Sequence, residues 1–287
     1  MKETTNNYYL ERIAALKLYI QQNLFKHLTL EELARVSCFS EYHFHRLFSI
    51  YVGESVASYI KRLRIEYAAQ QLAYTADSIQ IITHKTLFKT QSAFSKAFRQ
   101  YYNASPSEYR KGKQHELSST LASYSLPQIK DLAKDIEYCS VEKIRVLSLI
   151  RQGPCLTAGF KAWEDLEEYA CSRNLITSHT RRFGTTLDPR DITDDDKHRY
   201  VAMITVDSSV EPEGEFFIQT LGGGPYAVFP HNGSYEYLYL TCTSIFCKWL
   251  PTSNEKLRDS IMFDEYICRD LSKPVEELQT KIYVPIQ

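Results

Sequence analysis

Two segments, 40–51 and 90–102, carry polar side chains of the kind that hydrogen-bond to the edges of DNA bases. Both have apolar residues at i, i+3, i+4 and i+7, which predicts a helix with one buried face. The residues expected to be buried are Phe44, Leu47, Phe48 and Tyr51, and Phe94, Ala97, Phe98 and Tyr101. The residues expected to face outward are Glu41, Tyr42, His45, Arg46 and Ser49, and Gln91, Ser92, Ser95, Lys96 and Arg99. Such faces suit a major groove, although either one alone would be an ordinary solvated surface.

A short helix and a tight turn are expected before each of these segments. The residues that can cap the helices are Thr29 with Glu32 as a capping box, Asp77 or Ser78, Ser40 and Thr90. The order of short helix, turn and longer helix predicts a helix-turn-helix unit, and the chain carries this order twice.

A longer helix is expected between the two units, over residues 55–74, which are rich in Ala, Leu, Arg and Gln. At ~1.5 Å per residue it would span about 30 Å. Successive major-groove faces of DNA are ~34 Å apart. A single chain could therefore present both polar helix faces to one side of a duplex.

The charge of the chain is divided unevenly. The formal net charge is −1, but residues 1–117 hold 16 Lys and Arg against 10 Asp and Glu, a net +6. Residues 118–287 hold 18 against 25, a net −7. This division is typical of a polyanion-binding module joined to a second domain, although a chance fluctuation would give the same asymmetry.

The second part of the chain has a different pattern of apolar residues. Alternating apolar runs predict strands from about residue 136, and helices are expected near 155–172 and 234–250. The pattern predicts two successive strand-helix-strand-strand units. We therefore expect a multidomain protein: an all-α N-terminal domain over 1–113, a polar, serine-rich linker over 114–134, and an α+β domain over 135–287.

Other kinds of chemistry have weaker support. The seven cysteines form no CxxC pair, which predicts reduced thiols in the cytoplasm and no zinc framework. The run Gly222–Pro225 lacks the residues of a phosphate loop and is expected to be a hairpin or bulge. The acidic run 194–196 is expected to be solvated, and no apolar run is long enough to span a bilayer. We expect neither a metal nor a cofactor.

The end of the second helix-turn-helix unit resembles the AraC/XylS family of transcription regulators. The matching residues are Phe94-x-x-x-Phe98 followed by Ser105-Pro106-x-x-Tyr109-Arg110, and the resemblance covers about residues 8–112. It implies DNA contacts by Tyr42, His45, Arg46, Gln91, Ser92, Ser95 and Lys96, and a phosphate contact by Arg64.

Four positions depart from that family pattern. One is Thr83, where the family has alanine in the first helix of the second unit. Cys38 and Leu87 stand where the family often has glycine in the turn, and Asn103 replaces the glycine before Ser105-Pro106. A left-handed residue with a side chain costs roughly 1 kcal/mol, so we expect the turns at Cys38 and Leu87 to be less tight or differently shaped. Asn103 tolerates a positive φ.

The C-terminal part resembles the GyrI-like effector-binding domain, and the whole chain resembles regulators of the Rob (right-origin-binding) type. The resemblance is carried by Gly153-Pro154, Gly223-Gly224-Pro225-Tyr226, His231-x-Gly233-x-Tyr235, Trp249-Leu250-Pro251 and Phe263-Asp264-Glu265-Tyr266. It implies a cleft of aromatic residues and a carboxylate that binds hydrophobic, often cationic, small molecules. The candidate residues are Trp163, Tyr200, Tyr226, Tyr235 and Tyr283, with Asp264 or Glu265 as the carboxylate. For each aromatic residue, plain core packing is the alternative.

Asp264 and Glu265 cannot both face such a cleft, because neighbouring strand residues point to opposite faces. Asp264 fits the family spacing, two residues before the tyrosine, but a slight shift of register would favour Glu265. We interpret the chain as a cytoplasmic, non-enzymatic transcription regulator, an activator that binds promoter DNA, a small-molecule effector and RNA polymerase. A GyrI-like hydrolase and a ligand-free protein-docking module are the alternatives.

Overall fold

The computed structural model describes residues 2–124, 132, 134–188, 192–258, 260–268 and 274–287. The chain divides into two compact units. The first consists of residues 1–113 with 213–215, and the second of residues 114–212 with 216–287.

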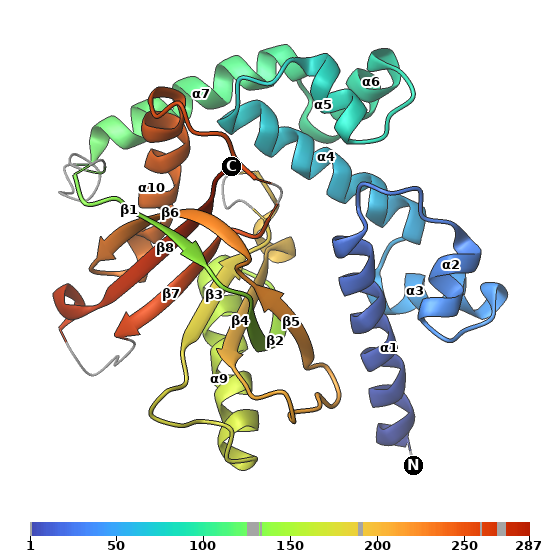
Figure 1. The fold of residues 1–287 in the computed structure, drawn as a ribbon. Helices are drawn as coiled ribbons and strands as arrows, with labels where there is room; N and C mark the ends of the chain where they lie inside the picture. The colour runs from blue at the N-terminus through green and yellow to red at the C-terminus, as the bar shows by residue number, and fades with distance from the viewer. Residues whose placement is uncertain (1, 125–131, 133, 189–191, 259, 269–273) are drawn as a thin grey trace. The chain divides into compact units, whose positions relative to one another are not determined.

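The described N-terminal unit is built from helices (Figure 1). They are α1 (Lys2–Gln22), α2 (Leu30–Val36), α3 (Glu41–Val52), α4 (Val56–Tyr74), α5 (Ile79–Lys85), α6 (Gln91–Tyr102) and α7 (Pro106–Ser123). The pairs α2–α3 and α5–α6 are the two predicted helix-turn-helix units, and α4 connects them. Each cap acts as the sequence predicts: Thr29 and Glu32 form a capping box, and Ser78, Ser40 and Thr90 each accept a backbone N–H.

Both helix-turn-helix turns are tight, so the expectation of a looser turn is wrong. Cys38 and Leu87 adopt left-handed φ angles of 53° and 59°. The next residue closes each turn in the same way, since Phe39 N–H donates to the carbonyl of Ala34 at 3.0 Å and Phe88 N–H to that of Thr83 at 3.2 Å. Phe39 and Phe88 also pack into the apolar interior, which offsets the left-handed strain.

The apolar stripe of α6 differs from the prediction at one position. Phe94, Ala97 and Phe98 are buried, but Tyr101 is 41% exposed. Tyr102 packs inward in its place, with its ring 4.9 Å from the rings of Phe98 and Tyr109. Because Tyr109 of α7 packs on this side of α6, the buried face turns toward residue 102. In α3, Phe44 and Phe48 are fully buried, while Leu47 and Tyr51 are half-buried.

Arginines hold the ends of the helices together. Arg64 of α4 donates to the carbonyls of Leu24 and Lys26 at 2.9 and 2.8 Å, just beyond the end of α1. Arg110 of α7 donates to the carbonyls of Leu72 and Asp77 between α4 and α5. Leu72 lies in the last turn of α4, where the carbonyls have no partner within the helix, whereas Leu24, Lys26 and Asp77 lie in the loops between helices.

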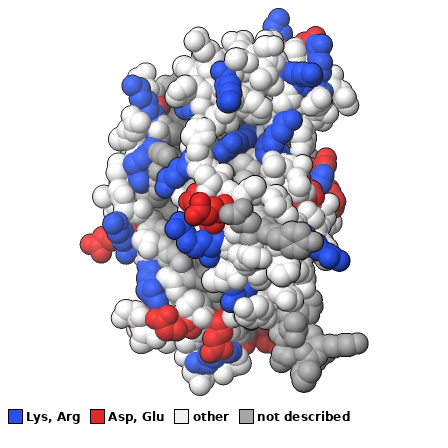
Figure 2. Space-filling view, turned by 90° about the vertical axis from the view of Figure 1, so that its right-hand side faces the viewer, with Lys and Arg blue, Asp and Glu red and all other residues white. Residues whose placement is uncertain are grey.

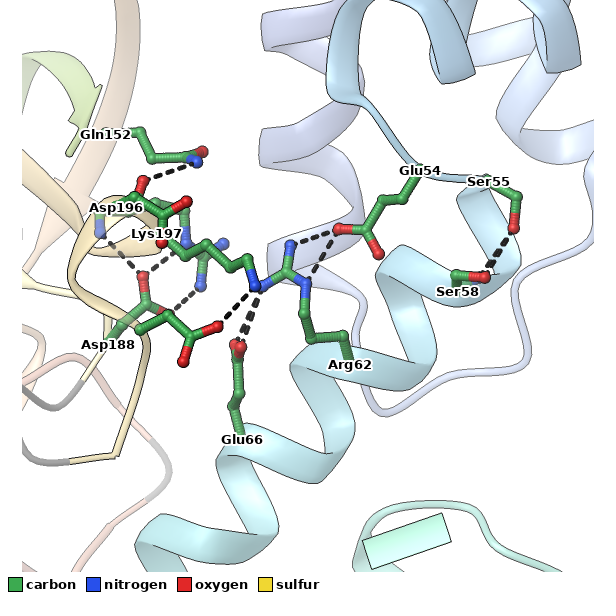
Figure 3. Close-up of polar contacts among 11 residues, drawn as sticks. Glu54, Ser55, Ser58, Arg62, Glu66, Gln152, Asp188, Asp196 and Lys197 are labelled. Carbon is green, nitrogen blue, oxygen red and sulfur yellow. Dashed lines mark hydrogen bonds and ion pairs between the residues drawn. The ribbon is translucent and has the colours of Figure 1, made fainter. Parts of the chain in front are cut away.

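A second arginine of α4 lies in a buried charge cluster. Arg62 lies between Glu54 and Glu66, with N–O distances of 2.7 and 3.0 Å (Figure 3). Its guanidinium also lies 5.1 Å from the centre of the Tyr59 ring. The two carboxylates compensate for the burial of the positive charge, and the cluster ties the loop after α3 to the middle of α4.

The C-terminal unit contains one antiparallel sheet in the order β1-β6-β8-β7-β3-β4-β2-β5 (Figure 1). The strands are β1 (Glu137–Val141), β2 (Ile144–Gln152), β3 (Arg182–Thr186), β4 (Arg199–Thr205), β5 (Phe217–Leu221), β6 (Gly224–Asn232), β7 (Phe263–Cys268) and β8 (Gln279–Pro285). The helical segments are α9 (Cys155–Ser172), α10 (Leu238–Ser244) with the π-helical turn Ile245–Trp249, and the 3-10 turns Asp195–Lys197, Tyr235–Tyr237, Leu250–Thr252 and Val275–Glu277.

The strand order is symmetric about the β7–β3 pair. The segments β2-α9-β3-β4 and β6-α10-β7-β8 follow the predicted strand-helix-strand-strand order, and the two halves of the sheet meet where β7 pairs with β3. The predicted fold class, an all-α tandem helix-turn-helix domain followed by an α+β domain, is confirmed.

The segment expected to be a linker begins inside a helix. α7 extends to Ser123, so residues 114–123 are helical. Leu117 and Leu121 lie on one face of this helix and are buried, and Leu121 packs against Leu240 of α10. These two leucines give a serine-rich segment enough apolar contact to remain helical. Of the remaining expected linker, residues 125–131 and 133 lie outside the described part.

Candidate DNA interface and effector site

The faces of α3 and α6 that were predicted to contact DNA lie at the surface. His45, Arg46 and Ser49 are exposed on α3. On α6, Gln91, Ser92 and Lys96 are exposed and Ser95 is half-buried. Lys and Arg side chains are spread over the side of the N-terminal unit that Figure 2 presents, with Asp and Glu in a few smaller groups. The two helices thus offer donors and positive charge at matching positions.

Two of the predicted DNA-binding residues need separate comment. The side chain of Tyr42 lies outside the described part of the chain. Arg64 is half-buried, and two of its guanidinium nitrogens donate to backbone carbonyls of the loop after α1. The guanidinium of Arg64 therefore ties the loop after α1 to α4. This contact alone explains a basic residue at this position, and the phosphate contact stays a prediction.

The pairing register places Asp264 at the seam of the sheet. Residues directly opposite one another on paired strands share a face, and one such row is Leu149, Ala202, Gly184, Asp264, Ile282 and Phe229. Leu149 and Ala202 pack in the cluster beneath α9, and Phe229 and Ile282 pack against Trp249 after α10. Asp264 therefore lies on the helix-covered face, between the two helical clusters.

An aromatic cluster lies on this same face. The indole N–H of Trp163 donates to the Tyr200 hydroxyl at 3.1 Å, and the hydroxyls of Tyr200 and Tyr266 lie 2.6 Å apart. The Tyr266 ring makes edge-to-face contacts with Trp163 and Tyr235, at 5.6 and 5.3 Å between centroids. Trp163, Tyr200, Tyr235 and Tyr266 form what we name the aromatic cluster. Gly184 makes it possible, because a Cβ there would lie 2.0 Å from the Tyr200 hydroxyl.

The Asp264 carboxylate is nearly buried and lacks a compensating charge. It is 9% exposed, and no described residue forms an ion pair or hydrogen bond with it. Burial raises the pKa of Asp264 to about 7. Burial also raises the pKa of Tyr266 well above its usual range, with smaller contributions from Tyr200 and Asp264. A buried carboxylate beside aromatic rings is an environment that attracts a cation.

Glu265 lies on the opposite face and is already paired. Its carboxylate accepts from Arg181 Nε at 2.7 Å and from the Tyr283 hydroxyl at 2.8 Å. The hydrogen bond to Glu265 is the largest reason why the pKa of Arg181 is raised. Tyr283 and Tyr226 belong to the apolar cluster on this face, together with Phe263. Of the predicted effector residues, Tyr226, Tyr283 and Glu265 are thus separated by the sheet from Trp163, Tyr200, Tyr235 and Asp264.

Sequence reasoning missed two residues, one in the aromatic cluster and one that pairs with Glu265. Tyr266 is the centre of the aromatic cluster, and its spacing of two residues from Asp264 in a strand was the available signal. Arg181 neutralises Glu265 from the segment before β3, and no local pattern connects residues so distant in sequence.

Comparison with known families and proteins agrees with this geometry. The model of the GyrI-like small molecule binding domain matches residues 134–287, and that of a helix-turn-helix domain matches residues 33–112. The first match covers more than half of the chain. The chain belongs to the GyrI-like family. This GyrI-like protein also carries a helix-turn-helix domain, which resembles the DNA-binding domains of AraC-type transcription regulators.

Three relatives of this GyrI-like protein each match less than half of its length. The HTH-type transcriptional activator AarP of Providencia stuartii is 36% identical over 98 residues, which are 34% of this chain and 73% of AarP. The Tn10 TetD protein of Escherichia coli is 34% identical over 36% of this chain and 74% of TetD. The uncharacterized HTH-type regulator YbfP of Bacillus subtilis is 35% identical over 43% of this chain, and the match spans only 42% of YbfP.

Solved structures include similar chains. An AraC-type transcriptional regulator from Chromobacterium violaceum is 26% identical, with a TM-score of 0.34 over 36% of this chain and 91% of that one. EcmrR in its DNA complex is 13% identical, with a TM-score of 0.47 over 90% of this chain and 98% of that one. Within the described ranges of the GyrI-like protein, no helix is long and apolar enough to cross a membrane. These ranges also contain no group of three His, Cys, Asp or Glu residues that could hold a metal ion.

Proposed function

We propose that residues 1–113 bind promoter DNA sequence-specifically through the exposed faces of α3 and α6. The observation that carries this proposal is the repetition of one surface on two equivalent helices, with Arg46 on α3 and Lys96 on α6 following the same buried phenylalanine stripe. Arg46, His45 and Gln91 are donors suited to base edges, whereas positive charges elsewhere on the unit would contact phosphates.

The predicted C-terminal domain, residues 135–287, binds a hydrophobic cation that alters the activity of the regulator. Asp264 supplies the negative charge, and the aromatic cluster supplies ring faces whose quadrupoles attract a cation. The absence of a counter-charge on Asp264 among the described residues supports this assignment over Glu265, which Arg181 neutralises. Because the domain is joined to a DNA-binding module, we infer that it senses its ligand and does not turn it over.

RNA polymerase is the proposed protein partner, and the cytoplasm is the proposed location. The relative AarP is a transcriptional activator by name, which supports a role in activation. The segment 114–134 is the proposed connection between the two domains, beginning with the second half of α7.

Selection of bound fragments from the host genome, with the full chain at low salt, tests the DNA-binding function. We expect a recurring promoter motif whose affinity falls steeply as salt rises. Arg46→Ala should cost about 1–3 kcal/mol on that motif and relax the preference at one position. Lys143→Ala, which removes an exposed charge from the C-terminal unit, is the matched control. It should change neither the affinity for the motif nor the sequence preference. Enrichment of no fragment by the unaltered chain would exclude this function.

A further inference from the structure

The proposed effector site contains a hydrogen-bond chain with one fixed end. An indole N–H can only donate, so Trp163 donates and the Tyr200 hydroxyl oxygen accepts, at 3.1 Å. The hydroxyls of Tyr200 and Tyr266 are 2.6 Å apart, so one of them donates to the other. The direction of this second bond decides which hydroxyl proton remains for a ligand.

Two features favour donation from Tyr200 to Tyr266. A hydroxyl that accepts a hydrogen bond becomes a better donor, because successive bonds in a chain polarise one another. Tyr200 is only 8% exposed, whereas Tyr266 is half-buried. The chain Trp163 to Tyr200 to Tyr266 therefore leaves the final proton on Tyr266, the more exposed of the two tyrosines.

Tyr266 and Asp264 lie on the same face of β7, two residues apart. Their backbone positions are separated by ~7 Å, since a strand rises 3.2–3.4 Å per residue. In the described part of the chain, no hydrogen bond joins the two side chains. The site thus offers a negative charge and, on the same face of the sheet, a hydroxyl donor.

We propose that the effector is a cation that also carries a hydrogen-bond acceptor. The charge lies against Asp264, the acceptor takes the proton of the Tyr266 hydroxyl, and the rings of Trp163 and Tyr235 flank the molecule. This inference rests on the proposed effector function and adds the chemical class of the ligand.

A matched pair of ligands tests it. The 4-acetyl and 4-isopropyl derivatives of benzyltrimethylammonium have the same charge and nearly the same shape, but only the acetyl compound has an acceptor. We expect the full chain to bind the acetyl compound about three- to tenfold more tightly in titration calorimetry, the value of one neutral hydrogen bond. In Tyr266→Phe, which removes the donor and keeps the ring, the two affinities should become equal. The exposed Tyr138→Phe in β1 is the control and should keep the difference.

The possible outcomes separate this inference from the proposed function. Equal binding of both compounds to the unaltered chain overturns the acceptor requirement and leaves cation binding intact. A difference that persists in a folded Tyr266→Phe chain overturns the role of Tyr266. Tyr200→Phe is the second variant. It retains the Tyr266 hydroxyl but removes the hydrogen bond from Trp163, so the difference in affinity between the acetyl and isopropyl compounds should decrease but remain measurable. Binding of neither compound to the unaltered chain overturns both the cation site and the inference.

Discussion

Asp264 and Glu265 are neighbours in β7, yet the sheet separates their carboxylates. Asp264 faces the aromatic cluster and lacks a cationic partner among the described residues, while Glu265 faces the other side and pairs with Arg181 and Tyr283. Asp264 is therefore the carboxylate that we propose for the ligand, whereas Glu265 is paired within the domain. Substitution of Asp264 should lower the affinity for a cation and retain stability, whereas substitution of Glu265 should lower stability and retain that affinity.

Asp264→Asn should remove cation binding and should not destabilise the protein. The amide keeps the size of the side chain but loses the buried charge, which has no compensating partner in the free protein. We expect the affinity for a lipophilic cation to fall about ten- to hundredfold, the value of a charge-assisted contact. Calorimetric titration measures this loss, and urea unfolding should show an unchanged or higher free energy of unfolding at pH 8.

Glu265→Gln should weaken the fold and retain cation binding. The substitution removes the charge that pairs with Arg181, and we expect the free energy of unfolding to fall by about 1–2 kcal/mol, since Arg181 is partly exposed and the pair is screened. Urea unfolding measures the change. Loss of cation affinity in a folded Glu265→Gln chain would place the effector site on the other face of the sheet.

Cation binding should weaken as the pH falls below 7. The pKa of Asp264 is about 7 in the folded protein, so a lower pH converts the carboxylate to the neutral acid. Below that pKa the affinity should fall by up to about tenfold for each pH unit. Titrations at pH 5.5, 6.5 and 7.5 measure the slope, and an affinity that is constant over this range would contradict it.

The stability of the free protein should respond to pH in the opposite sense. Because the folded chain binds the Asp264 proton more tightly than the unfolded chain, the contribution of this residue decreases as the pH rises from about 4 to about 7 and is then constant. Comparison with Asp264→Asn isolates this contribution: the difference in unfolding free energy between the two proteins should change across that range.

Arg64→Ala should lower stability more than it alters DNA recognition. The substitution leaves the carbonyls of Leu24 and Lys26 without their donors, and we expect a loss of about 1–3 kcal/mol in the free energy of unfolding. Lys61→Ala, an exposed basic residue of the same helix, is the matched control. Unchanged stability with uniformly weaker DNA binding would show instead that Arg64 acts through a phosphate.

Local patterns in the sequence determined the helices, their caps and the two repeated halves. Helical periodicity, capping residues such as Ser40 and Thr90, and strand alternation all act over a few residues, so they can be read without a structure. The alternation in β7 also showed that Asp264 and Glu265 must face opposite ways.

The tertiary structure decided which way each residue faces. Alternation does not specify the covered side of a sheet, and the packing of α9 and α10 placed Asp264 on it. Long-range contacts likewise directed Arg64 to backbone carbonyls, turned Tyr102 inward in place of Tyr101, and brought Tyr266 against Tyr200. These positions depend on partners far apart in the chain, which local propensity does not encode.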